Sequence, residues 1–213
     1  MNKFWLLLLF SCTLLAQTNN DYLVQANIKV GVTMPQLTSW AFTDICCNAY
    51  NVYPGYSVGM GFESPDLLDI YNARLSSEIG ITYGQASTGE ITQYSEKAKF
   101  TLTYLPIFLW AKLKTTGTIV PFVKIGIGAE RTEFIENYYI ANQYNFDIKQ
   151  WSFSWGAGAG IDVNYSQNIT ISLYVDTIIK ERGIAQRVNA LRTFDFDFRS
   201  GNAFFGIQFG YKL

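Results

Sequence analysis

The sequence contains no histidine, and charged residues fill only 15% of its 213 positions. General acid–base catalysis near neutral pH most often uses an imidazole, so the absence of histidine argues against most hydrolases and acyltransferases. The formal net charge of −1 argues against a nucleic-acid-binding domain, which would carry a strongly basic surface. We therefore expect a protein that is not an enzyme, has no nucleic-acid partner and holds no cofactor or metal ion.

The sequence also lacks an apolar run long enough to cross a bilayer as a helix. Its longest apolar run, residues 4–15, follows Lys3 and precedes the small residue Ala16. A basic residue, a short apolar run and a small residue together make a secretory signal peptide. We predict a signal peptide over residues 1–16 and one domain over residues 17–213. Lipidation of Cys12, within the lipoprotein-like segment 9–12, is the alternative.

The two cysteines of the predicted mature chain, Cys46 and Cys47, are neighbours in the sequence. A disulfide between neighbouring residues closes a strained ring and cannot link distant parts of a fold. We therefore interpret them as a thiol pair in a loop with no structural role, and either oxidation state is compatible with that position.

Residues 151–165, WSFSWGAGAGIDVNY, alternate between two kinds of side chain, which is typical of a β-strand. One set is aromatic and aliphatic, with aromatic residues at both ends. The other set is serine, glycine, aspartate and asparagine, which suits a crowded interior better than bulk water. From Trp155 to Tyr165 the strand would rise about 34 Å, or about 26 Å at a tilt of about 40°, close to the apolar band of an outer-membrane barrel. We interpret the stretch as a transmembrane strand with lipid outside and a packed lumen inside.

The same alternation recurs along the mature chain with regular interruptions. We predict eight strands, over residues 23–34, 55–63, 70–83, 99–113, 120–132, 151–165, 169–179 and 203–213. Short turns at residues 64–66, 115–117 and 166–168 alternate with long connections at residues 35–54, 84–97, 135–149 and 180–200. This order is typical of an all-β, eight-stranded antiparallel up-and-down transmembrane β-barrel, with both chain ends at the short-turn, periplasmic side. In the fourth strand the apolar residues change parity, which predicts a β-bulge near Pro106.

Four segments carry a resemblance to a known family: residues 29–32 (KVGV), 103–107 (TYLPI), 121–126 (PFVKIG) and 206–213 (GIQFGYKL). With them the chain resembles the small outer-membrane β-barrels that include the transmembrane domains of OmpA and OmpX and the porin-family barrels of Bacteroidota-type bacteria. The resemblance implies export to the outer membrane of a Gram-negative cell, contact with its lipid and lipopolysaccharide, and recognition by the barrel-insertion machinery. In this family the barrel-insertion machinery reads a signal at the C-terminus of the chain. The chain departs from that signal by ending on Leu213 rather than on phenylalanine or tryptophan.

The inward parity of the predicted strands collects ten charged residues, five of each sign. The interior of an eight-stranded barrel is just wide enough for side chains to fill it. Because buried charges must be paired, we predict an ion-pair network across the lumen, with Glu63 near Arg74 and Lys124 near Asp162. A gated narrow pore is the alternative. The ten residues are Lys29, Glu63, Arg74, Glu78, Lys112, Lys124, Glu130, Asp162, Asp176 and Lys212.

The long connections hold aromatic residues and arginines, which are enriched at the energetic centres of binding interfaces. Exposed loops on a rigid scaffold are also where binding function concentrates. We predict that they bind an extracellular ligand or that the arginines contact anionic lipopolysaccharide; alternatively, the aromatic residues only extend strands above the bilayer. The candidate residues are Trp40, Phe42, Tyr138, Tyr139, Tyr144, Arg182, Arg187, Arg192 and Phe196.

The predicted function is therefore that of an integral outer-membrane barrel with a structural or surface-binding role and no catalysis. Two other functions fit the same alternation. One is a narrow pore for small solutes. The other is a soluble lipocalin-like barrel, in which the apolar set would face inward and line a ligand cavity, although the glycine-rich polar set argues against a surface in water.

Overall fold

The computed structural model describes residues 23–38, 52–88, 91–93, 96–138, 147–180, 183–189 and 192–213. Within them, side chains are described for residues 23–35, 53–69, 71–87, 101–133, 151–179 and 201–213. The predicted signal peptide lies outside the described residues, as do Cys12, Cys46 and Cys47, so these predictions stay predictions.

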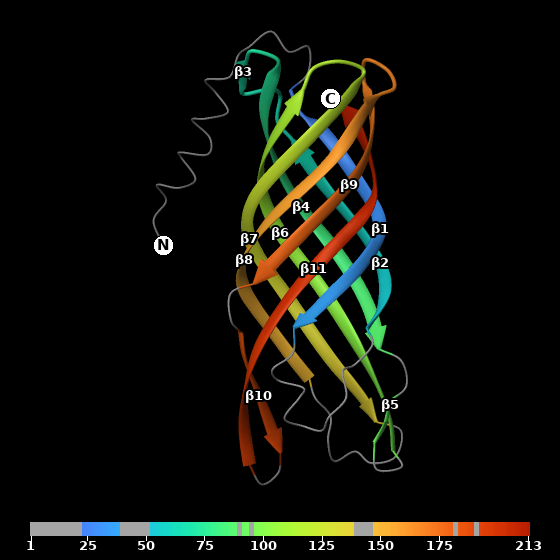
Figure 1. The fold of residues 1–213 in the computed structure, drawn as a ribbon, viewed down its shortest axis with the longest axis vertical. Helices are drawn as coiled ribbons and strands as arrows, with labels where there is room; N and C mark the ends of the chain where they lie inside the picture. Colours follow the sequence, from blue (N-terminus) through green and yellow to red (C-terminus); the bar gives the residue numbers. More distant parts are fainter. Residues whose placement is uncertain are drawn as a thin grey trace.

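Eight long strands wind around one axis and close into an antiparallel barrel (Figure 1). Their order is β4-β2-β1-β11-β9-β8-β7-β6, and the pairing of β4 with β6 closes the ring. Three short strands, β3, β5 and β10, form hairpins with strands of the barrel. The described residues contain no helix that is long and apolar enough to span a membrane. The strands are β1 Gln25–Thr38, β2 Val52–Glu63, β3 Leu68–Ile70, β4 Ala73–Thr88, β5 Ile91–Gln93, β6 Glu96–Thr115, β7 Ile119–Tyr138, β8 Asp147–Asn164, β9 Ile169–Lys180, β10 Gly183–Asn189 and β11 Arg192–Lys212.

The eight predicted strands and the fold class are confirmed, and the differences lie at the strand ends. The third predicted strand begins at Ala73 rather than at Ile70, because Tyr71 has a φ of 56° and turns the chain between β3 and β4. β6 and β7 each have 20 residues and β11 has 21. These strands are longer than predicted because they extend further toward the long connections. The segment 180–200, predicted as a polar loop, contains β10 paired with β11.

The predicted bulge near Pro106 is wrong. The pairing of β6 with β7 runs without a shift from Ala98↔Tyr138 to Lys114↔Phe122. The parity of the apolar residues changes because β6 is apolar on both faces: Leu102 and its inward neighbours are buried in the lumen, whereas Ile107 and Leu109 are exposed on the wall. The irregularity lies instead in β2, between Tyr53 and Tyr56.

The outer wall of the barrel is an apolar belt bordered by polar and aromatic residues. On β7 the outward positions are apolar from Ile119 to Ala129, and the charged Arg131 and Glu133 follow. That apolar length rises about 34 Å, or about 26 Å at a tilt of about 40°, which matches the lipid-facing band of an outer-membrane barrel. The belt consists of exposed side chains such as Ile28, Val30, Met60, Ile79, Leu109, Ile125, Ile127, Ile161, Leu173 and Ile207.

The glycines of β8 face the lumen and leave room for large side chains from β6 and β7. A Cβ added at Gly156 would lie 2.7 Å from the Trp110 ring, and one at Gly160 would collide with the Phe122 ring. At Gly158 it would collide with Asp176 and with the Lys124 side chain. The alternate glycines of the sequence therefore mark the wall against which the lumen is packed.

Candidate functional site

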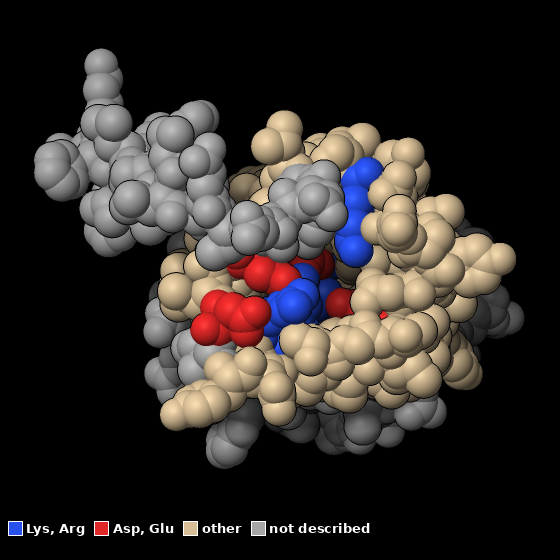
Figure 2. All heavy atoms as spheres, turned by 90° about the horizontal axis from the view of Figure 1, so that it is seen from above, with Lys and Arg blue, Asp and Glu red and all other residues tan. Residues whose placement is uncertain are grey.

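The lumen holds two kinds of buried side chain in two halves. Charged side chains gather in the half near the short turns. The half near the long loops contains the buried side chains Leu102, Tyr104, Phe108, Ile178 and Phe204 together with buried polar residues such as Glu130 and Asn202. Figure 2, seen along the axis from the short-turn end, shows basic and acidic side chains side by side in the mouth of the barrel.

A first group of ion pairs runs from the mouth into the lumen. Lys114 at the end of β6 contacts both Asp66, at 2.8 Å, and Glu63, at 2.9 Å. Deeper inside, Lys112 donates a hydrogen bond of 3.0 Å to Glu63 and one of 2.7 Å to Asp162. These side chains come from the turn after β2, from β2, from β6 and from β8. They therefore tie opposite parts of the barrel wall together.

A second group lies one layer further along the barrel. Lys29 on β1 pairs with Glu78 on β4. Lys124 on β7 lies 3.8 Å from the other oxygen of Glu78 and 2.9 Å from Asp176 on β9. Alternating charges thus cross the lumen from β1 to β9 through side chains that are almost completely buried.

Aromatic rings complete the packing around two of the lysines. The ammonium of Lys112 lies 4.2 Å from the centre of the Phe122 ring, and that of Lys124 lies 4.5 Å from the centre of the Trp110 ring. Such cation–π contacts are strongest where water is excluded. The lysines are therefore held by carboxylates and by rings, with little room for bulk water around them.

The structure links seven of the ten predicted lumen residues to one another by ion pairs, but neither of the two specific pairs that we predicted is formed. Arg74 contacts Asp66 at 3.2 Å and Asp69 at 3.6 Å, while Glu63 is bound by Lys112 and Lys114, because Arg74 sits at the rim beside the turn acids. The seven linked residues are Lys29, Glu63, Glu78, Lys112, Lys124, Asp162 and Asp176.

The predicted pair of Lys124 and Asp162 is also wrong. The register of β7 and β8 places Lys124 opposite Gly158 and Asp162 opposite Val120, near the mouth. Asp162 therefore binds Lys112, and Lys124 reaches Asp176 on β9 instead. Sequence reasoning also missed Lys114, which shares its inward parity with Lys112 but lies one residue beyond the predicted strand 99–113.

The remaining two predicted lumen residues lie at opposite ends of the lumen. Glu130 is fully buried near the long loops, where Asn202 Nδ2 donates to both of its carboxylate oxygens at 3.1 and 3.2 Å. Thr132 donates a further hydrogen bond to it. Lys212 lines the mouth at the short-turn end. In the described part of the chain, no group of three or more potential metal ligands is found.

The predicted loop residues are placed only in part. Trp40, Phe42, Tyr139, Tyr144 and Arg182 lie outside the described residues. The others lie in strands beyond the lipid-facing band: Tyr138 ends β7, Arg187 of β10 pairs with Phe194, Arg192 begins β11, and Phe196 pairs with Ala185. β10 and the part of β11 paired with it therefore form a hairpin, here called the outer hairpin (residues 183–189 and 192–198), at the end of the barrel far from the C-terminus (Figure 1).

Comparison with solved structures identifies the fold. The sequence matches no known protein-family model and no curated protein. The structure is similar to a major outer membrane protein from Thermus thermophilus (TM-score 0.56, 9% identity, 89% of this chain and 99% of that one). It is also similar to the outer membrane protein OprG from Pseudomonas aeruginosa (0.53, 13%, 90% and 98%) and to the outer membrane protease OmpT from Escherichia coli (0.52, 6%, 93% and 100%).

These likenesses confirm the predicted resemblance to small outer-membrane barrels at the level of the fold; the likeness to barrels of Bacteroidota-type bacteria stays a prediction. Because a protease is among the similar structures, the fold alone does not decide whether the chain is an enzyme. The chain therefore has the fold of an outer-membrane transmembrane β-barrel.

Proposed function

We propose that this protein is an integral outer-membrane barrel that acts as a closed, non-catalytic anchor for surface-exposed binding structure. The observation that carries the proposal is the arrangement of the two faces. Ile125 and Leu173 on the wall are 70% and 61% exposed, whereas Lys112 and Glu78 in the lumen are each 1% exposed. A wall of this kind is stable in lipid, because the hydrophobic effect would oppose its exposure to water.

The same arrangement argues against the soluble lipocalin-like alternative. A lipocalin-like barrel would direct its apolar set into a ligand cavity, but here the alternating apolar set faces outward on the described strands. An exposed apolar belt this large on a soluble monomer would drive aggregation.

The packing of the lumen also argues against a narrow pore. Conduction needs a continuous polar passage, with sites that ions can both enter and leave. In the described part of the chain, Lys112 bridges Glu63 and Asp162 across the lumen, and Leu102 and Phe204 are buried in the half near the long loops. Breaking the ion pairs to open a passage would leave uncompensated buried charges. The proposal is therefore a closed barrel.

The binding role is assigned to the strand extensions at the long-loop end. The outer hairpin carries Arg187 and Phe196 at positions paired with Phe194 and Ala185, so aromatic and basic residues are held on a regular β-ladder. Residues of these types dominate binding interfaces. An extracellular ligand and outer-leaflet lipopolysaccharide are the partners that the proposal implies, and the barrel-insertion machinery would act on the chain during assembly.

The experiment that tests the proposal replaces residues 184–197 by an Asn-Gly turn. Wild-type and shortened proteins are expected to fractionate with the outer membrane and to migrate faster on gels when unheated, as folded barrels do. Affinity capture on intact cells should recover a surface ligand with the wild type and lose it with the shortened protein. Migration that boiling does not change would contradict the barrel, and equal capture by both proteins would contradict the role of the outer hairpin.

A further inference from the structure

The mouth of the barrel at the short-turn end contains a polar cavity that the structural role does not require. Its volume is about 100 Å³, enough for several water molecules or one very small solute. The cavity is blind, because Lys112 lies beneath it and bridges Glu63 and Asp162 across the lumen. The cavity is therefore a vestibule rather than the entrance to a passage.

One wall of the vestibule is fixed by a chain of hydrogen bonds. Asn164 Nδ2 donates to the carbonyl of Gly117 at 2.9 Å, and Thr170 Oγ1 contacts Asn164 Oδ1 at 3.2 Å and Gln25 Oε1 at 3.3 Å. These bonds join β8, β9, β1 and the turn between β6 and β7. A wall held in this way is preorganised, so little conformational entropy is lost when a ligand binds.

Two groups in the vestibule have bonding capacity to spare. Asp162 is 4% exposed; its Oδ2 accepts a hydrogen bond from Lys112, but its Oδ1 has no hydrogen-bond partner among the described residues. A buried carboxylate oxygen without a donor is costly, so it favours a ligand that brings one. Arg74 Nε makes no hydrogen bond in the described structure and lies 3.6 Å from Asp69 Oδ2, and the Arg74 side chain is 41% exposed.

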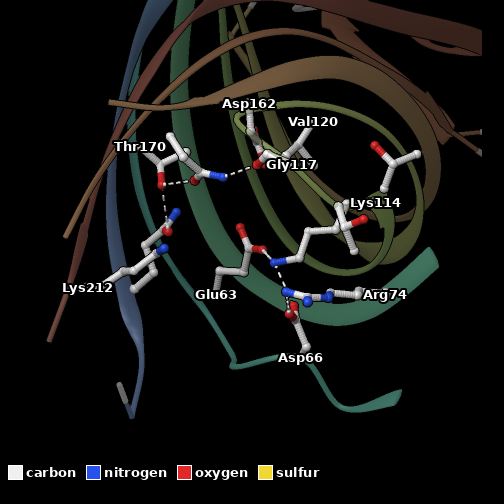
Figure 3. Close-up of a pocket in the computed structure, with 13 residues that line it drawn as sticks. Glu63, Asp66, Arg74, Lys114, Gly117, Val120, Asp162, Thr170 and Lys212 are labelled. Atoms are coloured by element: carbon white, nitrogen blue, oxygen red, sulfur yellow. Dashed lines mark hydrogen bonds and ion pairs between the residues drawn. The ribbon is translucent and has the colours of Figure 1, made fainter. Parts of the chain in front are cut away.

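The charges around the vestibule balance. Three acids and three bases line it, so a single anion or cation would bring in a charge that nothing compensates. In Figure 3, Asp162 and Thr170 lie on one side of the cavity and Lys212, Glu63 and Arg74 on the other. Asp162 and the two basic residues Arg74 and Lys212 thus lie on different sides of the cavity. The charged lining residues are Glu63, Asp66, Arg74, Lys114, Asp162 and Lys212.

We propose that this vestibule binds a small zwitterion, of the class of free α-amino acids with little or no side chain. The ammonium of the ligand donates to Asp162 Oδ1, and its carboxylate accepts from Arg74 and from Lys212, whose ammonium has three donor hydrogens. The cavity volume has room for an amino acid of this size. This site lies at the opposite end of the barrel from the outer hairpin, so the inference goes beyond the surface role proposed above.

The test uses the folded protein in detergent, checked by its unheated gel migration, with glycine as the probe and saturation-transfer NMR as the readout. Glycine should bind saturably. N-acetylglycine, which lacks the ammonium, and glycinamide, which lacks the carboxylate, should each bind about tenfold more weakly, because each loses one charge-assisted interaction. No saturable glycine binding, or equal binding of all three compounds, would overturn the proposal.

Two substitutions place the ligand in the vestibule. Lys212→Gln removes a half-exposed charge at the rim and should weaken glycine binding by about threefold to tenfold. Asp162→Asn should abolish the advantage of glycine over N-acetylglycine. Arg131→Gln, the matched control on the outer wall near the other end of the barrel, should change nothing. If Asp162→Asn does not fold, the comparison of glycine affinity between Lys212→Gln and Arg131→Gln still tests the proposal. Equal glycine affinity in these two variants would contradict a site at the mouth.

Discussion

Lys112 shows how much one residue of the lumen holds together. Its ammonium donates to Glu63 on β2 and to Asp162 on β8, and it lies over the ring of Phe122 on β7. The side chain is 1% exposed, so none of these interactions is weakened by bulk water. Single residues here stabilise the wall through contacts that are distant in the sequence.

Replacing Lys112 by methionine should therefore destabilise the barrel strongly. The variant keeps most of the side-chain volume but leaves Asp162 without its lysine, and Glu63 keeps only Lys114. Removing one partner of a buried pair costs about 3–5 kcal/mol of the free energy of unfolding. Urea unfolding of the barrel in lipid vesicles, followed by tryptophan fluorescence, measures that loss.

Arg131→Met is the matched control for Lys112→Met. Arg131 pairs with Glu133 on the outer wall, and 38% of its side chain is exposed. Exposed pairs contribute at most about 1 kcal/mol. A loss for Lys112→Met as small as that for Arg131→Met would contradict the interpretation of the lumen as a network of buried ion pairs.

At the same scale, the sequence predicted which side chains enter the lumen but not which side chains they pair with. Parity along a strand determines the face, and that is a local property. The partner depends on the stagger between strands. Lys124 is opposite Gly158, which is four residues from Asp162 along β8, so Lys124 pairs with Asp176 instead. The sequence prediction put Arg74 inside the lumen rather than at its rim, because the turn at Tyr71 was not recognised. No local pattern encodes these offsets.

At the scale of the element, the strands were predictable because each had to cross the same band. The outward set of β7 stays apolar from Ile119 to Ala129, and this length separates strand from loop in the sequence. β10 and the long-loop ends of β6, β7 and β11 continue as strands beyond the band. There, both faces can be polar, so alternation no longer distinguishes a strand from a loop.

Depth within the band should determine the cost of a charge on the wall. Ile125 is near the middle of the apolar length of β7, and Ile119 is at its edge; both are exposed. Ile125→Arg should lower the free energy of unfolding in vesicles by about 2–4 kcal/mol, and Ile119→Arg by about 0–1 kcal/mol. Equal effects at the two positions would show that this wall does not face lipid.

At the scale of the whole molecule, the two ends of the barrel are different. One end has short turns, the C-terminus and the charged mouth. The other has β5, the outer hairpin and the extended ends of β6, β7 and β11 (Figure 1). Outer-membrane barrels keep their short turns in the periplasm and their longer loops outside the cell. The orientation decides which compartment has access to the mouth and which has access to the outer hairpin.

Labelling of single cysteines on whole cells tests this orientation. In a background with Cys46 and Cys47 replaced by serine, Thr116→Cys lies on the turn between β6 and β7, and Gln186→Cys lies on β10. A membrane-impermeant maleimide should label Gln186→Cys on intact cells and Thr116→Cys only after the outer membrane is permeabilised. The exposed position of Thr116 makes it reactive once the reagent has access, so failure to label it in intact cells reflects the membrane barrier. Labelling of Thr116→Cys alone on intact cells would mean that the barrel is inserted the other way round, with the charged mouth open to the cell exterior.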